Sequence, residues 1–227
     1  MNKVRAILAD IDGTLTTGGD LTSVNRLLKD KIWIARARGI KFNLASGRRY
    51  AEQEAYRDII LSPHSAIEGE GILYEGSCLR MYGSDEVHYL GGLTRDQLDE
   101  IDRFVAHFVD GMVPQRDNHL YETVTGYETP SFQESGKTDY GLLERTFKVV
   151  KPVVEALYPV DVCMSADAID IMAKGVTKAL PTVRYSEITG IPLSEMAVFC
   201  DSGNDMPMAQ VVGEAGGLVV YVGNRSD

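Results

Sequence analysis

The sequence of 227 residues predicts an α/β fold, in which a Rossmann-like, doubly wound parallel sheet carries a smaller inserted α+β domain. Short apolar runs alternate with helical patterns over the first 68 residues and again toward the end of the chain. Such alternation is typical of a parallel sheet with right-handed crossovers. Between these two stretches, strands and helices do not alternate. We therefore expect a core of residues 1–82 and 167–227, with an α+β domain at 83–166 inserted into it.

The first part of the chain is predicted to supply three strands and two helices. The strands are apolar and short, which is typical of strands buried in a parallel sheet. The helices show apolar residues at helical spacing, and Gly39 and Pro63 mark their ends. The strands are expected at 4–9, 40–45 and 65–68, and the helices at 23–38 and 50–61.

The middle of the chain predicts two hairpins and two helices. Glu75-Gly76-Ser77 separates two short strands, and Thr94 with Gln97 has the spacing of a capping box that opens a helix. Pro152 is a point at which the second helix could break. The hairpins are expected at 72–82 and 160–173, the helices from 94 and over 140–157, and strand-and-loop structure at 111–137.

The last part of the chain returns to the alternating pattern. Gly190 follows a helical stretch in which Pro181 is tolerated in the first turn. The predicted elements are helices at 177–189 and 206–212 and strands at 196–200 and 218–222.

Charge and cysteine content limit the classes of partner. The net charge is −10, from 23 basic and 33 acidic residues, and no basic cluster is present, which argues against nucleic acid. No run approaches the roughly 18 apolar residues that a membrane span needs. The three cysteines have no CxxC spacing, so they predict free thiols and a cytoplasmic protein. A small phosphorylated metabolite needs only a local positive site and stays compatible, and a homodimer is left open.

Three polar clusters each follow directly on a predicted parallel strand. They are residues 10–14 (Asp-Ile-Asp-Gly-Thr), 46–48 (Ser-Gly-Arg) and 201–205 (Asp-Ser-Gly-Asn-Asp). Ligands of open α/β sheets bind at the carboxyl ends of the strands, so these clusters are expected to converge on one crevice. Each has a simpler interpretation as a turn or, for Asp205, a helix cap, and their common placement favours a site.

The residue types in these clusters predict phosphate chemistry. The carboxylates of Asp10, Asp12, Asp201 and Asp205 are hard oxygen ligands, which favour Mg²⁺ over zinc. We predict Asp10 as a nucleophile that forms an aspartyl-phosphate and Asp12 as the acid and base. The Ser46 hydroxyl and the Gly47 amide suit phosphate oxygens. A cation is also expected, with Lys178 preferred and Lys174 as its competitor.

Together these residues resemble the haloacid dehalogenase superfamily of phosphohydrolases. Residues 10–16 are similar to its first motif, 45–48 to the second, Lys178 to the lysine of the third and 201–205 to the fourth. The insert resembles the α/β cap of the Cof-like branch. The size of the chain and residues 170–178 are similar to archaeal-type phosphoglycolate phosphatases and sugar-phosphate phosphatases.

The resemblance implies a role for each matching residue. Asp10 would be phosphorylated, and Asp12 would protonate the leaving alcohol and then activate water. Mg²⁺ would be held by Asp10, the Asp12 backbone carbonyl, Asp201 and Asp205. Thr14, Ser46 and Lys178 would hold the phosphoryl group, with Asn204 assisting and Arg48 placed toward the substrate. The cap would close over the substrate.

The sequence departs from the family pattern at three places. Cys200 replaces a glycine, residues 68–71 (Glu-Gly-Glu-Gly) replace a stretch with Asn-Gly, and the chain is expected to be a short or truncated member. The expected function is a Mg²⁺-dependent phosphatase of a small metabolite, phosphoglycolate or a sugar phosphate. The alternatives are a phosphomutase or phosphotransferase that uses the same nucleophile and a non-catalytic phosphate-binding regulatory protein.

Overall fold

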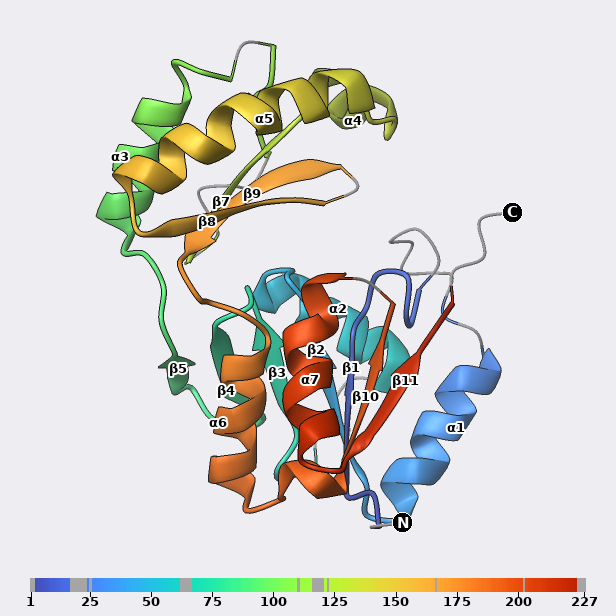
Figure 1. Ribbon diagram of the computed structural model, residues 1–227. Coiled ribbons are helices and arrows are strands. Elements are labelled where there is room, and N and C mark those ends of the chain that lie inside the picture. Colours follow the sequence, from blue (N-terminus) through green and yellow to red (C-terminus); the bar gives the residue numbers. More distant parts are fainter. Residues whose placement is uncertain are drawn as a thin grey trace. The chain divides into compact units, whose positions relative to one another are not determined.

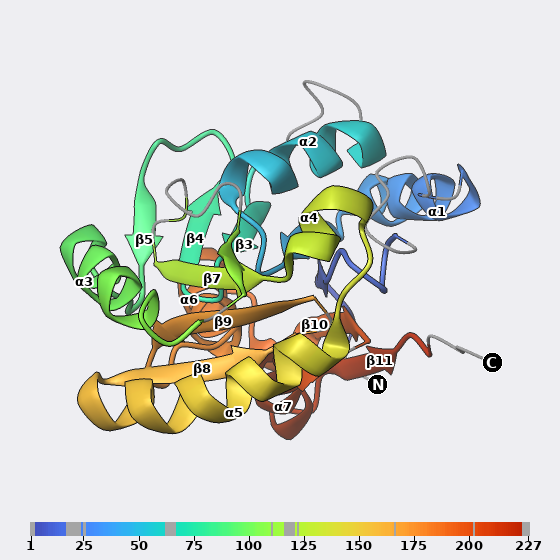
Figure 2. The same cartoon turned by 90° about the horizontal axis from the view of Figure 1, so that it is seen from above.

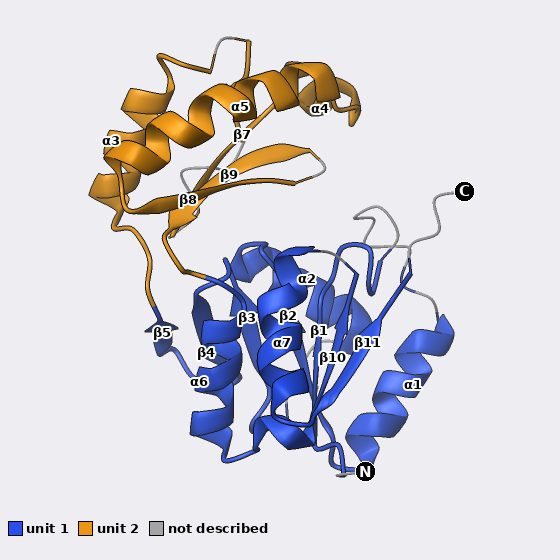
Figure 3. Cartoon of the chain, in the orientation of Figure 1, with its two compact units in different colours: residues 1–90, 177–227 blue, residues 91–176 orange. Residues whose placement is uncertain are grey.

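The computed structural model describes residues 3–16, 24, 26–61, 67–109, 111–115, 121, 123–165, 167–201 and 203–223. The chain divides into two compact units, shown in blue and orange in Figure 3. Unit 1 contains residues 1–90 and 177–227, and unit 2 contains residues 91–176. The second unit is therefore inserted in sequence between the two halves of the first.

Unit 1 is built on a seven-stranded sheet with the order β11-β10-β1-β2-β3-β4-β5 (Figure 1). The strands from β11 to β3 pair in parallel, and β4 and β5 continue the sheet in antiparallel fashion. The predicted α/β fold with a parallel sheet is thus confirmed. The strands are β1 (Ala6–Ala9), β2 (Lys41–Ala45), β3 (Gly71–Tyr74), β4 (Cys78–Met81), β5 (Val87–Tyr89), β10 (Met196–Cys200) and β11 (Leu218–Tyr221).

Helices cover both faces of this sheet, as Figure 2 shows. Two of them, α1 (Arg26–Ala37) and α2 (Tyr50–Leu61), pack on one face, where Ile32 and Tyr56 join a core with Leu44 of β2. The other two, α6 (Ala179–Thr189) and α7 (Met206–Glu214), bury Tyr185 and Met208 against the opposite face. Short 3₁₀ turns, η3 (Leu193–Glu195) and η4 (Gly203–Asp205), flank β10. This double covering explains why the parallel strands read as continuous apolar runs.

The third parallel strand lies later in the chain than predicted. We expected it at 65–68, but residues 68 and 69 form a turn, and 65 and 66 lie outside the described residues. The strand that pairs with β2 is β3 (Gly71–Tyr74), which also forms the predicted hairpin with β4. The expectation was wrong because one strand serves both purposes. Gly69 has a φ of 83°, a left-handed conformation that glycine adopts readily and that turns the chain just before β3.

Unit 2 consists of a four-stranded antiparallel sheet with helices on one face. The strand order is β6-β7-β9-β8, and the buried side chains of α3 and α5 form its core with residues such as Ile169 and Ile171 of β9. The elements are α3 (Arg95–Val105), β6 (Val113–Pro114), β7 (Val124–Glu128), α4 (Pro130–Ser135), α5 (Tyr140–Leu157), β8 (Val160–Met164) and β9 (Ala168–Ala173).

Two local predictions in unit 2 concern its helices. The capping box that opens α3 is confirmed. The backbone N–H of Gln97 donates to Thr94 Oγ1, and the backbone N–H of Thr94 donates to Gln97 Oε1. The break at Pro152 is not found, and α5 continues through it. Pro152 is exposed, while Val150 and Val154 are buried, so the burial of the apolar stripe outweighs the lost hydrogen bond. In the described part of the chain, no helix has the length and apolarity required to cross a membrane.

The ends of unit 2 differ from the predicted insert of 83–166. Strand β5 pairs with β4, which keeps residues up to 90 in unit 1. Strand β9 pairs with both β7 and β8, which places it in unit 2, although its residues were expected in the second core segment. Hydrogen bonding between strands, which local sequence does not encode, therefore sets both ends.

Candidate active site

The predicted site begins where the central strand β1 ends. Asp10 follows β1 directly, is buried, and donates its backbone N–H to the Phe199 carbonyl of β10 at 3.0 Å. The chain then turns sharply, with Gly13 at a φ of 83° and its N–H bonded to the Thr16 carbonyl. Because β1 pairs with β10 and β2 on its two sides, the segments after these three strands lie next to one another.

A buried lysine joins two of the predicted carboxylates. Lys178 Nζ donates to Asp10 Oδ1 at 2.8 Å and to Asp205 Oδ1 at 2.5 Å. The three side chains are 5%, 6% and 0% exposed. Lys178 stands at the start of α6 and Asp205 at the start of α7, so the two helices bring these groups to Asp10. The cation is therefore Lys178, because Lys174 is exposed in unit 2.

A third carboxylate completes the cluster. Asp201 follows β10, accepts a hydrogen bond from Thr14 Oγ1 at 3.2 Å, and donates its N–H to Asp205 Oδ2 at 3.4 Å. Asp205 stands at the N-cap position of α7, but its side chain forms no capping bond there. One oxygen each from Asp10, Asp201 and Asp205 lies within 4.8 Å of the others. This all-oxygen set fits a divalent cation, and Mg²⁺ is the hard ion that such ligands prefer.

Burial and charge shift the pKa values in this cluster. Burial, reinforced by the nearby Asp205, raises the pKa of Asp10 to about 6, although Lys178 acts in the opposite direction. Burial also raises the pKa of Asp201. For Lys178, burial alone would lower the pKa, but the two carboxylates outweigh it and the net shift is upward. The cluster contains one cation and three carboxylates, so a further positive charge would stabilise it.

The segment after β2 contributes the second predicted cluster. Ser46 is buried, and its Oγ accepts the Arg48 N–H at 3.3 Å. The Arg48 guanidinium holds Asp12 with two hydrogen bonds, from Nε to Oδ2 at 2.7 Å and from Nη2 to Oδ1 at 3.0 Å. These bonds raise the pKa of Arg48. The Asp12 side chain is partly open to solvent, with 41% of it exposed.

Two predicted residues lie at the edge of this arrangement. Gly47 is exposed between Ser46 and Arg48, and Asn204 is exposed in η4. The structure therefore brings together Asp10, Thr14, Lys178, Asp201 and Asp205 in one hydrogen-bonded group, with the Asp12–Arg48 pair as a second group.

Helix α2 supplies three residues near Arg48 that the sequence reasoning did not identify. Glu52 lies 3.7 Å from the Arg48 guanidinium, and the Tyr56 ring centroid lies 5.3 Å from it. Gln53 is fully buried and donates hydrogen bonds to the Ser46 and Arg48 carbonyls. The available signal was a polar residue, Gln53, at helical spacing with the buried Tyr56 and Ile60.

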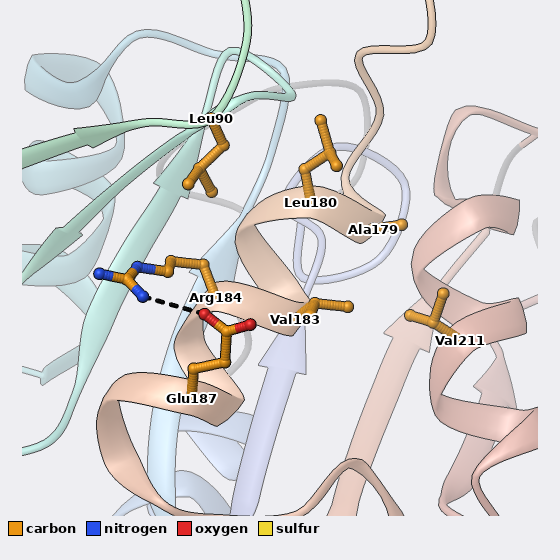
Figure 4. Close-up of a pocket in the computed structure, with 7 residues that line it drawn as sticks. All are labelled: Leu90, Ala179, Leu180, Val183, Arg184, Glu187 and Val211. Carbon is orange, nitrogen blue, oxygen red and sulfur yellow. Dashed lines mark hydrogen bonds and ion pairs between the residues drawn. The ribbon is translucent and has the colours of Figure 1, made fainter.

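A separate hollow of about 410 Å³ lies between α6, α7 and the end of β5 (Figure 4). Its walls are mostly apolar, and an ion pair between Arg184 and Glu187 at 2.9 Å forms one side. None of the predicted site residues lines it. The lining residues are Leu90, Ala179, Leu180, Val183, Arg184, Glu187 and Val211.

Comparisons with known proteins agree with the motif resemblance. Residues 162–227 match the family described as haloacid dehalogenase-like hydrolase. No match was found among curated proteins.

Solved structures share the fold of nearly the whole chain. A haloacid dehalogenase-like hydrolase from Bacteroides thetaiotaomicron aligns with a TM-score of 0.71 at 16% identity, covering 96% of this chain and 94% of that one. The C-terminal domain of trehalose-6-phosphate phosphatase from C. albicans aligns at 0.68 and 19% identity, covering 93% and 75%. A subclass IIB sugar phosphatase of the same superfamily aligns at 0.62 and 19% identity, covering 96% and 94%. The family match and the shared fold confirm the resemblance of this chain to the haloacid dehalogenase superfamily.

Proposed function

We propose that this protein is a Mg²⁺-dependent phosphomonoester hydrolase that acts on a small sugar phosphate through an aspartyl-phosphate intermediate. The observation that carries the proposal is the buried group of Asp10, Lys178 and Asp205 with Asp201 beside it. Such a group combines a nucleophilic oxygen, a fixed ammonium for phosphoryl oxygens and a carboxylate set for a metal. The motif resemblance and the hydrolase family match support the same reaction class.

The reaction would proceed in two displacements at phosphorus. An Asp10 carboxylate oxygen attacks, the bond between phosphorus and the ester oxygen breaks, and the leaving oxygen takes a proton from Asp12. Water then gives a proton back to Asp12 and attacks the aspartyl-phosphate, which releases phosphate and restores the Asp10 carboxylate. Lys178 and Thr14 would bind phosphoryl oxygens in both steps, and Ser46 would join them. Bound Mg²⁺ would supply positive charge against the transferring group.

Arg48 has a defined part in this scheme. It holds Asp12 through two hydrogen bonds, which fix the direction of the carboxyl group and occupy both of its oxygens. A phosphate ester brings negative charge that competes with Asp12 for Arg48. We propose that substrate binding loosens this pair and so frees Asp12 to carry a proton.

The charge of the site favours a neutral leaving group. Its acidic side chains are four aspartates (Asp10, Asp12, Asp201, Asp205) and its basic side chains are Arg48 and Lys178, so acidic groups outnumber basic ones. Among the described residues of this group, both cations are already engaged, Lys178 by Asp10 and Asp205 and Arg48 by Asp12, so neither is left over for a carboxylate on the substrate. We therefore propose a sugar phosphate rather than phosphoglycolate, and the sugar phosphatase and trehalose-6-phosphate phosphatase folds above point to the same substrate class.

The test is phosphate release by the purified protein from a panel of sugar phosphates, with phosphoglycolate in parallel. We expect turnover with Mg²⁺, none after EDTA, and a higher kcat/KM for at least one sugar phosphate than for phosphoglycolate. Asp10→Asn is the control for the covalent step, because it removes the nucleophilic oxygen and keeps the shape.

Three outcomes would contradict parts of the proposal. Full turnover by Asp10→Asn would exclude the aspartyl-phosphate, and a preference for phosphoglycolate would exclude the charge argument. Transfer of phosphate to a second sugar, with little release to water, would identify a phosphotransferase instead. A cytoplasmic location, expected from the free cysteines, stays a prediction.

A further inference from the structure

Gln53 of α2 occupies an unusual place for a polar side chain. It is 0% exposed, and it stands at the carboxyl ends of β2 and β3. Its Nε2 lies within hydrogen-bond distance of three backbone carbonyls, which share its two N–H groups, those of Ser46 at 3.1 Å, Arg48 at 2.9 Å and Leu73 at 3.1 Å. One side chain thus connects both ends of the Ser46–Arg48 segment to the neighbouring strand.

The orientation of this amide follows from its surroundings. Three carbonyl oxygens face one end of the side chain, and only the NH₂ group can satisfy them, since an oxygen there would be repelled. The amide oxygen, Oε1, then points elsewhere and has no hydrogen-bond partner among the described residues. Within the described part of the chain, Gln53 thus carries a buried acceptor that has no partner, a feature that is rare in folded proteins and calls for a reason.

Stability supplies only part of that reason. The Leu73 carbonyl also accepts the Ser46 N–H, and the Arg48 carbonyl also accepts the Glu75 N–H. Two of the three carbonyls would therefore stay bonded if Gln53 were absent. A methionine of similar volume would remove the unsatisfied oxygen and still fill the space beside Tyr56.

We propose that Gln53 is a positioning residue of the phosphate site, and this inference rests on the proposed function. By holding the Ser46 and Arg48 carbonyls, it fixes the conformation of the Ser46–Arg48 segment. That conformation sets where the Ser46 hydroxyl lies and from where Arg48 reaches Asp12. Gln53 itself touches no reacting atom. A shift of this segment would weaken phosphate binding and leave the carboxylate cluster of Asp10, Asp201 and Asp205 intact.

The experiment compares Gln53→Met with the wild-type protein and with Ile60→Val. Ile60 is also buried on α2 but packs only in the apolar core, so its variant controls for loss of packing. We measure inorganic phosphate binding to the Mg²⁺-loaded protein by calorimetry, Mg²⁺ binding without phosphate, and turnover of a phosphate ester. For Gln53→Met we expect phosphate Kd and KM to rise about tenfold or more, since small misplacements of binding groups have large effects. Mg²⁺ affinity should match that of the wild type, and Tm should fall only modestly, by what the lost bond to the Ser46 carbonyl contributes.

The outcomes separate this inference from the proposed function. Wild-type phosphate Kd in Gln53→Met would overturn the inference, and so would an equal rise in the Ile60→Val control or a parallel loss of Mg²⁺ affinity. If Gln53→Met does not fold, Gln53→Asn replaces it, because the shorter side chain keeps an amide that cannot reach all three carbonyls. A wild-type KM in Gln53→Asn would then overturn the inference. A wild-type protein that binds phosphate but hydrolyses no ester would overturn the proposed function alone, and the Gln53 comparison would still be read from phosphate binding.

Discussion

Two groups among the described residues of unit 1 each pair positive with negative side chains in the protein interior, but they differ in how many of each they contain. In the first, Arg36 of α1 binds Glu70 through two parallel hydrogen bonds of 2.8 Å, and Glu70 also accepts the Phe42 N–H at 3.0 Å. In the second, Lys178 binds both Asp10 and Asp205, and Asp201 lies beside them. The first pair and the side chains of Lys178, Asp10 and Asp205 are almost fully removed from solvent, whereas Asp201 is partly exposed.

The difference lies in the charge balance. Arg36 and Glu70 form two parallel hydrogen bonds, so the charge of each is neutralised by the other. Such a pair can hold α1 to the sheet without any ligand. The Lys178 group has one positive charge for three carboxylates, and burial raises the pKa of Asp10 to about 6. Buried charge without balance is unfavourable unless a ligand supplies what is missing. The balanced pair fits a structural role, and the unbalanced group is the candidate site.

The largest expected effect separates activity from stability at the unbalanced group. Asp10→Asn should lower kcat by roughly 10³-fold or more, because the amide cannot attack phosphorus. Its free energy of unfolding should change little, since Lys178 keeps Asp205 as a partner. Phosphate release and urea unfolding of the same preparation measure the two quantities. A large loss of stability with activity retained would reverse the assignment of roles.

The balanced pair should behave in the opposite way. Arg36→Met leaves Glu70 buried without its cationic partner and should reduce the free energy of unfolding by about 3–5 kcal/mol. Adding Glu70→Gln should recover part of this loss, because the amide oxygen can still accept the Phe42 N–H. Urea unfolding of both variants provides the measurement, and kcat of the folded protein should stay near that of the wild type. A stability change below about 1 kcal/mol for Arg36→Met would contradict this view.

The pH dependence of stability should report the unbalanced group in the metal-free protein. The pKa of Asp10 is raised by folding from 3.8 to about 6, so between these values the folded state binds more protons than the unfolded state. Stability should therefore fall as the pH rises through this window, by on the order of 2–3 kcal/mol from this group. The test is the difference between the wild-type and Asp10→Asn stability curves without metal. Excess Mg²⁺ should remove the fall, and a difference curve that rises with pH would contradict the prediction.

The smallest effect is expected at an ion pair that is exposed. Arg5 and Glu195 lie 3.0 Å apart, with side chains 49% and 29% exposed, and they join the start of β1 to η3. Arg5→Ala should change the free energy of unfolding by less than about 1 kcal/mol, because solvent screens such pairs. Thermal unfolding at low and high salt measures this, with Arg36→Met as the matched buried comparison. If Arg5→Ala lowered Tm as much as Arg36→Met does, burial would not decide how much an ion pair contributes to stability.

Several elements could be predicted because their signals are local. They depend on neighbouring residues and on the spacing at which apolar residues recur along the sequence. Examples are the capping box of Thr94 and Gln97, the helix at 50–61 and the strand at 196–200. The third parallel strand was misplaced because residues 65–68 and 71–74 carry similar short apolar patterns. Only pairing with β2 distinguishes them, and this contact joins residues almost 30 positions apart.

The candidate site shows the same limit. The sequence by itself determined which residues are candidates for the chemistry, since Asp10, Ser46, Lys178 and Asp201 each stand at the end or start of an element that periodicity could locate. Only the tertiary structure decided that Lys178 joins Asp10 to Asp205, that Arg48 holds Asp12 and that Gln53 ties the Ser46–Arg48 segment. The physical reason is that periodicity records how deeply each residue is buried. Which buried groups meet depends on how separate strands and helices pack, and that information is spread over the whole chain.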